Sequence, residues 1–147
     1  MIVRAALTAC LLTVATVAPL RADAISDGVA ALSGTVQDVR TVGTWEKDDK
    51  KGLYRVVIVR SGPEPTARLF IQWLAVAEDG AITIDRTVDI KEMVELKRNI
   101  GDVVIETDED GLSLFLEVFD PAADGAKDSY ELFISDDEAY RFGPASN

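Results

Sequence analysis

Histidine is absent from all 147 residues, and the single cysteine, Cys10, lies close to the N-terminus. A chain without histidine lacks the commonest general base, the usual imidazole ligand of transition metals and the side chain that titrates near neutral pH. Ser-His-Asp catalysis, Cys-His catalysis and histidine-zinc chemistry are therefore excluded. A single cysteine cannot form a disulfide within the chain, so the fold depends on its own hydrophobic core.

Long apolar runs are also scarce, and the one at the N-terminus is short. The uncharged stretch 5–17 follows Arg4 and is shorter than the about 20 residues that a membrane-spanning helix needs. Residues 22–24 (Ala-Asp-Ala) then have the small-x-small pattern that a signal peptidase reads. We interpret residues 1–24 as a cleaved secretory signal peptide. We expect residues 25–147 to form one soluble β-rich domain, periplasmic or secreted.

Two other interpretations of the N-terminus exist. Residues 7–10 (Leu-Thr-Ala-Cys) resemble a lipobox, which would make Cys10 a lipid-anchored first residue. A lipoprotein signal has its strongest apolar run before the cysteine, however, and here that run follows it. The remaining alternative is an uncleaved membrane anchor.

The shortage of basic residues is the second strong signal. The chain has 15 Lys and Arg against 26 Asp and Glu, a net charge of −11. Residues 25–101 are nearly balanced, whereas residues 102–147 contain 13 acidic residues against Lys127 and Arg141 alone. Binding to phosphates needs clustered Lys and Arg, so nucleic acid is excluded as a partner and an anionic membrane is disfavoured. A basic protein, a divalent cation or a merely solvated acidic surface remain open.

Short runs rich in β-branched and aromatic residues, separated by turn residues, predict strands. Eight such segments are 36–45, 53–60, 68–77, 81–88, 103–107, 112–119, 130–135 and 140–142. Asp79-Gly80 and Asp110-Gly111 predict tight hairpin turns. The sequence therefore favours a mainly all-β fold, an antiparallel β-sandwich or barrel of about 7–8 strands.

One short helix is predicted around residues 89–98. Asp89 and Glu92 have the spacing of a capping box, and Ile90, Met93 and Val94 lie on one side of such a helix. The alternative is a continuation of the preceding strand. A further helical turn or two at 26–33 is left open.

Two predicted strands, 69–76 and 112–119, are apolar on both faces, which is not the pattern of a strand with one face in water. We expect the predicted helix or the N-terminal segment to provide the cover, with a homodimer or a ligand as the alternative. Gln72 and Glu117 interrupt these strands. Because burying these polar side chains unpaired is costly, we expect each to have a hydrogen-bonding or cationic partner, or to lie at the rim of the sheet. The alternative is that both are polar groups of one pocket.

An acidic segment has the ligand spacing of an EF-hand calcium loop over 12 residues. Its carboxylates are Glu106, Asp108, Asp110 and Glu117, with Gly111 at the turn position. The flanking residues are predicted strands rather than helices, so a hairpin with an acidic tip is the favoured interpretation. A weak Ca²⁺ site shared with Asp136, Asp137 and Glu138 is the alternative.

No catalytic motif occurs: the chain has no Gly-x-Ser-x-Gly, Ser-x-x-Lys, phosphate-binding glycine loop or dinucleotide fingerprint. We expect a binding or accessory protein, not an enzyme, with no cofactor, that contacts a basic envelope protein through an acidic surface. The candidate residues for this surface are Asp108, Glu109, Asp110, Asp136, Asp137 and Glu138. A small-ligand or Ca²⁺-binding domain is the first alternative, and a carboxylate-based hydrolase is the least favoured. Trp45, Tyr54 and Trp73 are expected in the core, or else along a ligand groove.

Overall fold

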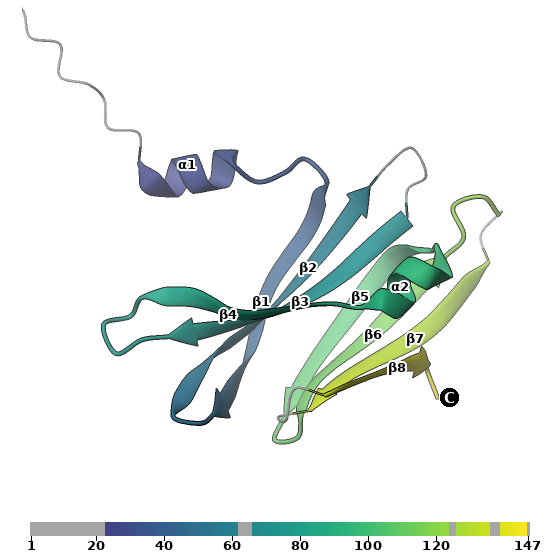
Figure 1. Ribbon diagram of the computed structural model, residues 1–147. Helices are drawn as coiled ribbons and strands as arrows, with labels where there is room; N and C mark the ends of the chain where they lie inside the picture. The colour runs from purple at the N-terminus through teal and green to yellow at the C-terminus, as the bar shows by residue number, and fades with distance from the viewer. Residues whose placement is uncertain (1–22, 62–65, 124–125, 136–138, 147) are drawn as a thin grey trace, which may run out of the picture. The chain divides into compact units, whose positions relative to one another are not determined.

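The protein is mainly β, with two four-stranded antiparallel sheets and two short helices (Figure 1). The structure, a computed structural model, describes residues 23–61, 66–123, 126–135 and 139–146. The candidate acidic residues at 136–138 lie outside these ranges. In chain order the elements are α1 (Ala24–Ala30), β1 (Val36–Lys47), β2 (Lys50–Ser61), β3 (Thr66–Val76), β4 (Ile82–Asp89), α2 (Lys91–Leu96), β5 (Asn99–Asp108), β6 (Gly111–Phe119), β7 (Lys127–Ser135) and β8 (Tyr140–Pro144).

Each sheet consists of four strands that are consecutive in the sequence. Sheet 1 has the order β1-β2-β3-β4, and sheet 2 has the order β5-β6-β7-β8. All eight predicted strand segments are confirmed. Among the described residues the strands form two separate sheets rather than one closed barrel, so the sandwich is the correct one of the two predicted architectures.

The two predicted hairpin turns are also confirmed. In the β5–β6 turn, Asp108 pairs with Gly111, and its carboxylate Oδ1 accepts hydrogen bonds from the backbone N–H groups of Asp110 (2.9 Å) and Gly111 (3.1 Å). In the β3–β4 turn, Asp79 Oδ1 accepts a hydrogen bond from Ala81 N (3.0 Å). Short acidic side chains thus stabilise both tips by bonding to nearby backbone.

One hydrophobic core lies between the inner faces of the two sheets. The alternate residues of β2 and β3 that face it include Tyr54, Val56, Leu69 and Ile71, all nearly fully buried. From sheet 2, β6 contributes Leu112, Leu114, Leu116 and Val118. Paired apolar faces of this kind are the basis of a β-sandwich.

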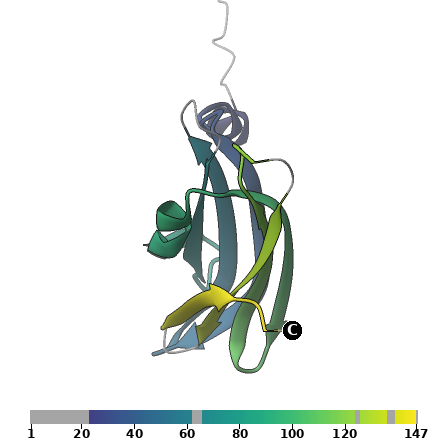
Figure 2. The ribbon, with the colours of Figure 1, turned by 90° about the vertical axis from the view of Figure 1, so that its right-hand side faces the viewer.

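The two sides of the sandwich are closed in different ways (Figure 2). On one side β1 approaches β5, where Arg40 Nη1 donates to the carbonyl oxygen of Val103 (3.0 Å). On the other side α2 packs against β3 and places Met93 in the core. From β8, the Tyr140 hydroxyl donates to a Glu92 carboxylate oxygen of α2 (3.1 Å).

The predicted helix exists, but its predicted capping box is wrong. The N-cap residue is Ile90, and no side chain caps the helix. Asp89 is instead the last residue of β4, and its carboxylate forms an ion pair with Arg68. The Asp89 carboxylate therefore binds the guanidinium of Arg68 on the neighbouring strand instead of capping the helix. Val94, expected on the buried side, is 46% exposed.

The inner core thus accounts for only one face of each sheet. Helix α2 contributes Met93 to this core, and its N-cap residue Ile90 is buried there too, so the helix does not provide the predicted cover for the outer faces. Outer-face apolar side chains keep substantial exposure: Val39 is 44%, Ile84 53% and Val104 51% exposed.

Helix α1 belongs to a separate unit of the chain, residues 1–32, whereas both sheets belong to residues 33–147. The Asp23 side chain caps α1 by accepting a hydrogen bond from Ile25 N (3.2 Å). The predicted signal cleavage after Ala24 falls at the first residue of this helix and stays a prediction. No helix among the described residues is long and apolar enough to span a membrane.

Candidate functional site

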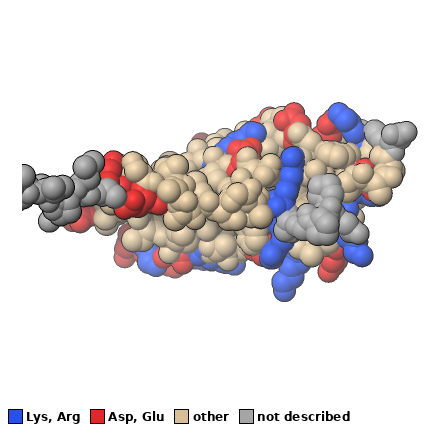
Figure 3. Space-filling view, turned by 90° about the horizontal axis from the view of Figure 1, so that it is seen from above, with Lys and Arg blue, Asp and Glu red and all other residues tan. Residues whose placement is uncertain are grey.

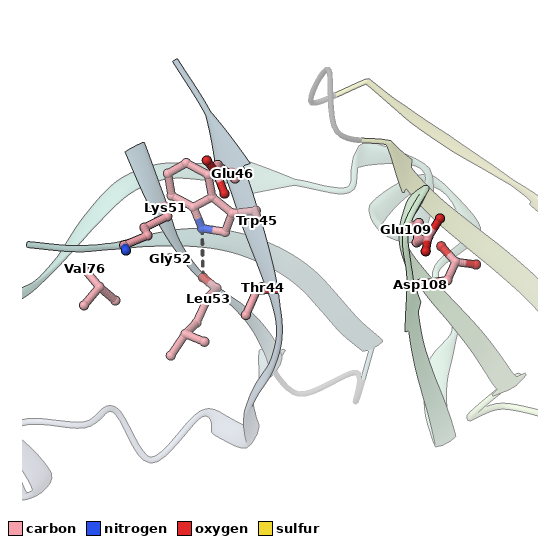
Figure 4. Close-up of a pocket in the computed structure, with 9 residues that line it drawn as sticks. All are labelled: Thr44, Trp45, Glu46, Lys51, Gly52, Leu53, Val76, Asp108 and Glu109. Carbon is pink, nitrogen blue, oxygen red and sulfur yellow. Dashed lines mark hydrogen bonds between the residues drawn. The ribbon is translucent and has the colours of Figure 1, made fainter. Parts of the chain in front are cut away.

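A groove of about 590 Å³ opens where the β1–β2 hairpin meets the β5–β6 turn (Figure 4). Its volume is within the range of small-ligand sites. The residues that line it are Thr44, Trp45, Glu46, Lys51, Gly52, Leu53, Val76, Asp108 and Glu109. We call this feature the groove.

The apolar wall of the groove is built around Trp45 of β1. The indole Nε1 donates to the carbonyl oxygen of Leu53 (3.2 Å), which fixes the ring against β2. Gly52 makes this packing possible, because a Cβ there would lie 1.7 Å from the carbonyl oxygen of Leu74 and 3.0 Å from Trp45 Nε1. Any larger residue at position 52 would force the backbone of β3 or the indole away.

The polar groups of the groove come from two hairpins. Glu46 and Lys51 are opposite each other on β1 and β2, and both are exposed. Asp108 and Glu109 come from the β5–β6 turn, across the groove from Trp45 in Figure 4. The lining therefore carries three carboxylates and one ammonium group, an acidic rim beside an apolar wall.

The two hairpins come together because β1 and β5 touch at a glycine. Gly43 has a φ of +52° and lies in a register irregularity of β1 between Val42 and Trp45. A Cβ on Gly43 would lie 2.5 Å from Thr107 Cγ2. Only glycine allows both this backbone conformation and this approach. Thr44 and Asp108, the next residue of each strand, line the groove.

The groove is lined by some, but not all, of the residues that the sequence predicted for the acidic binding surface. Asp108 and Glu109 both line it, and Asp110 belongs to the same turn without contributing to the lining. These carboxylates are exposed to solvent, and both turn N–H groups hold Asp108 in place. The arrangement suits the holding of a cation.

The EF-hand-like spacing is spread along one hairpin. Glu106 pairs with Ser113 and Glu117 pairs with Asp102, so the two glutamates lie four ladder positions apart, about 13 Å. Throughout the described ranges, no group of three or more His, Cys, Asp or Glu side chains is placed to hold a metal ion. The Ca²⁺ alternative therefore gains no support from Glu106, Asp108, Asp110 and Glu117.

Gln72 and Glu117 each have the partner that was expected. Arg55 Nε donates to Gln72 Oε1 (2.7 Å), and Gln72 Nε2 donates to the Thr87 hydroxyl (3.1 Å). Glu117 forms an ion pair with Lys127 at 2.6 Å. Gln72 is on sheet 1 and Glu117 on sheet 2, so they do not converge in one pocket.

A second acidic surface, which we did not predict, lies on the outer face of sheet 2. Asp102 and Glu117 are directly opposite each other and line a hollow of about 330 Å³ together with Val104 and Phe115. A second hollow, of about 210 Å³, includes Glu131, Phe133 and Arg141 among its lining residues. The alternation of acidic and aromatic residues in β6 and in β7 is the sequence signal for this face. The sequence does not show which residues of the two strands are neighbours, because that depends on the strand register.

Many basic side chains have a carboxylate neighbour, and both signs of charge lie close together in the view of Figure 3. Arg98 forms an ion pair with Asp120 beside the β6–β7 connection. A hydrogen bond from Ala122 N (2.8 Å), followed by the one from Arg98, lowers the pKa of the Asp120 carboxyl below its ordinary value of 3.8. Basic side chains are scarcer at the groove, where a single lysine accompanies three carboxylates.

The geometry of the groove has to be interpreted from this chain alone. Comparison of the chain with protein-family models, with curated proteins and with solved structures found no match. Evidence for a function therefore comes from the residues that line the groove.

Proposed function

We propose that this chain is an exported binding protein whose groove receives a basic side chain of a partner protein in the cell envelope. The observation that supports this proposal best is the acidic rim formed by Glu46, Asp108 and Glu109 beside an apolar wall. A lysine or arginine of the partner would place its charge among the carboxylates and its aliphatic stem along Leu53 and Val76.

The chemistry of the rim favours a cation over other ligands. Carboxylates accept charge-assisted hydrogen bonds from guanidinium and ammonium groups. Asp108 needs little reordering to accept one, because two turn N–H groups already fix its side chain. The surplus of acidic residues in the C-terminal part of the chain would add long-range attraction for a basic partner.

Titration of the purified protein with a short peptide of alternating arginine and leucine tests the proposal. We expect calorimetric binding at low salt that weakens as the salt concentration rises, because the rim is exposed and screening reduces its attraction. A counterpart peptide with glutamate in place of arginine should not bind. Binding of the basic peptide that is unchanged between low and high salt would contradict the proposal.

A pair of double variants separates the groove from the overall charge. Asp108→Asn with Glu109→Gln removes two charges from the rim, and the amide oxygen of the introduced asparagine still accepts the turn hydrogen bonds. Glu78→Gln with Asp79→Asn removes the same charge from the β3–β4 tip, outside the groove, where Asp79 has the equivalent turn bond. We expect about three- to tenfold weaker binding for the first variant only. Equal losses for both would show that only net charge matters.

The second candidate function is binding of a small organic cation in the same groove. Its volume of about 590 Å³ supports this alternative. The expected result is a rise in melting temperature with a ligand such as spermidine, because a ligand that binds only the folded state stabilises it. The same pair of double variants distinguishes groove binding from a general response to polycations.

A further inference from the structure

The outer face of sheet 1 combines apolar side chains with arginine. Residues paired across neighbouring strands share a face, so the pairs Arg55–Gln72, Val57–Phe70 and Leu53–Leu74 all lie on this side of the sheet. Arg55 is half-buried at its centre, and Arg68 lies over the ring of Phe70 at 4.8 Å. We call this surface the basic face. Its charged members are Lys51, Arg55 and Arg68 against Glu46 and Asp89.

The outer face of sheet 2 has the opposite charge and a similar apolar content. The register places Phe115 opposite Glu131 and Val104 opposite Phe115. We call this surface the acidic face. Its charged members are Asp102, Glu106, Glu117 and Glu131 against Lys127 and Arg141, around Val104, Phe115, Phe119 and Phe133.

One pair on the acidic face is electrostatically unfavourable in the isolated chain. Asp102 and Glu117 are directly opposite each other on neighbouring strands, where like charges are destabilising. Lys127 pairs with Glu117, and the hollow between the two carboxylates has Phe115 and Val104 in its lining. A second cation with an aliphatic stem would relieve the repulsion and cover the apolar lining.

The basic face presents cations of this kind. At its centre Arg55 has the neutral amide of Gln72 as its hydrogen-bond partner and apolar residues on the rows above and below it. Both faces are antiparallel sheets of four strands. Two different surfaces of the same molecule therefore have an excess of opposite charge, and both contain apolar side chains.

From this complementarity we infer that the protein associates with a second copy of itself, the basic face of one copy against the acidic face of the other. Arg55 of one copy, with the Arg68–Asp89 ion pair beside it, faces Asp102, Glu117 and Glu131 of its neighbour. The contact uses two different surfaces, so it is heterologous and leaves one of each surface unused in a dimer. It therefore builds rings or chains at high concentration. This association needs no other partner. It goes beyond the proposed function of the groove, with which the basic face shares Glu46, Lys51 and Leu53.

Sedimentation of the purified protein alone, from low micromolar to submillimolar concentration, tests the inference. We expect association that rises with concentration and weakens with salt. Arg55→Glu and Glu131→Lys should each weaken it at least about tenfold, because each brings like charges together. Lys91→Glu and Glu95→Lys make the same charge changes on exposed positions of α2 and serve as controls.

A mixture of the two single variants gives the decisive result. Arg55→Glu keeps an intact acidic face, and Glu131→Lys keeps an intact basic face. We therefore expect the mixture to regain association with nearly the wild-type affinity, and this recovery also shows that both variants are folded. A wild-type protein that stays monomeric overturns the inference. So does Glu131→Lys that associates like wild type, or a mixture of variants, folded by circular dichroism, that stays monomeric.

Discussion

Gly43 of β1 lies so close to Thr107 of β5 that a Cβ at position 43 would come within 2.5 Å of the threonine Cγ2. This contact joins the edges of the two sheets immediately beside the groove. It combines a steric requirement with a positive φ of 52°. The joint between the sheets thus depends on the absence of one side chain.

Gly43→Ala is expected to lower the free energy of unfolding by about 2–3 kcal/mol, because alanine meets both the strained backbone and the clash. Urea unfolding measures the change. Thr107→Ser in the same background removes Cγ2 and should recover part of the loss. Gly34→Ala, where nothing lies within 4 Å of the new Cβ, should change stability by less than about 0.5 kcal/mol. A similar loss in both glycine variants would contradict the role of the contact.

Helix α2 offers a matched pair of positions for testing how it seals the core. Met93 is fully buried, whereas its neighbour Val94 is 46% exposed. Met93→Ala should cost about 2–5 kcal/mol because it leaves a cavity in the core. Val94→Ala should cost less than about 0.5 kcal/mol. Thermal and urea unfolding of the two variants provide the comparison, and equal effects would show that α2 does not insert into the core.

The lowered pKa of Asp120 predicts a specific loss of stability in acid. A carboxyl group whose pKa is lower in the folded state stabilises the fold above its unfolded pKa, and this contribution is lost as the pH falls through the folded pKa. Asp120→Asn should therefore melt below the wild type at pH 6. The gap between their melting temperatures should shrink below about pH 4. A gap that is constant from pH 6 to pH 2.5 would be the contrary result.

Tyr140 predicts the matching behaviour in alkali. Burial, and then the hydrogen bond to Glu92, raise the pKa of its hydroxyl above the ordinary value of 10.0. The unfolded chain ionises first, so the wild type should lose stability as the pH rises above about 10. Tyr140→Phe should be less stable at pH 8 but should lose less stability above that pH. The difference between the phenolate absorbance titrations of the wild type and Tyr140→Phe gives the titration curve of the Tyr140 hydroxyl. A midpoint at or below pH 10 would contradict the raised pKa.

Local patterns were sufficient to predict the strands, both acidic hairpin turns and one helix. Alternation along the chain and turn residues such as Gly80 act over a few residues, so they can be recognised without knowledge of the rest of the fold. The sequence also predicted that Gln72 needs a hydrogen-bond partner, but it did not identify Arg55 as that partner. Burial cost alone required some partner at that position.

The features that the sequence did not predict all depend on residues that are distant along the chain. Asp89 does not cap α2, because Arg68 reaches it from the neighbouring strand. The groove needs Trp45 and Asp108 at one end of the sandwich, and the acidic face needs Asp102 opposite Glu117. Each of these depends on strand register and on the packing of two sheets. Strand register and sheet packing cannot be deduced from composition or from the spacing of residues.

The order of the strands has a consequence for how the molecule is made. Every pairing within a sheet joins strands that leave the ribosome one after the other, and sheet 1 is complete before the first residue of β5 is synthesised. Ladder formation therefore needs only short loop closures, while burial of the inner faces waits for the second half of the chain. A cut at Lys97, where α2 ends, would divide the protein into two fragments that each contain a whole four-stranded sheet. Reassembly of the fragments would depend mainly on their apolar inner faces.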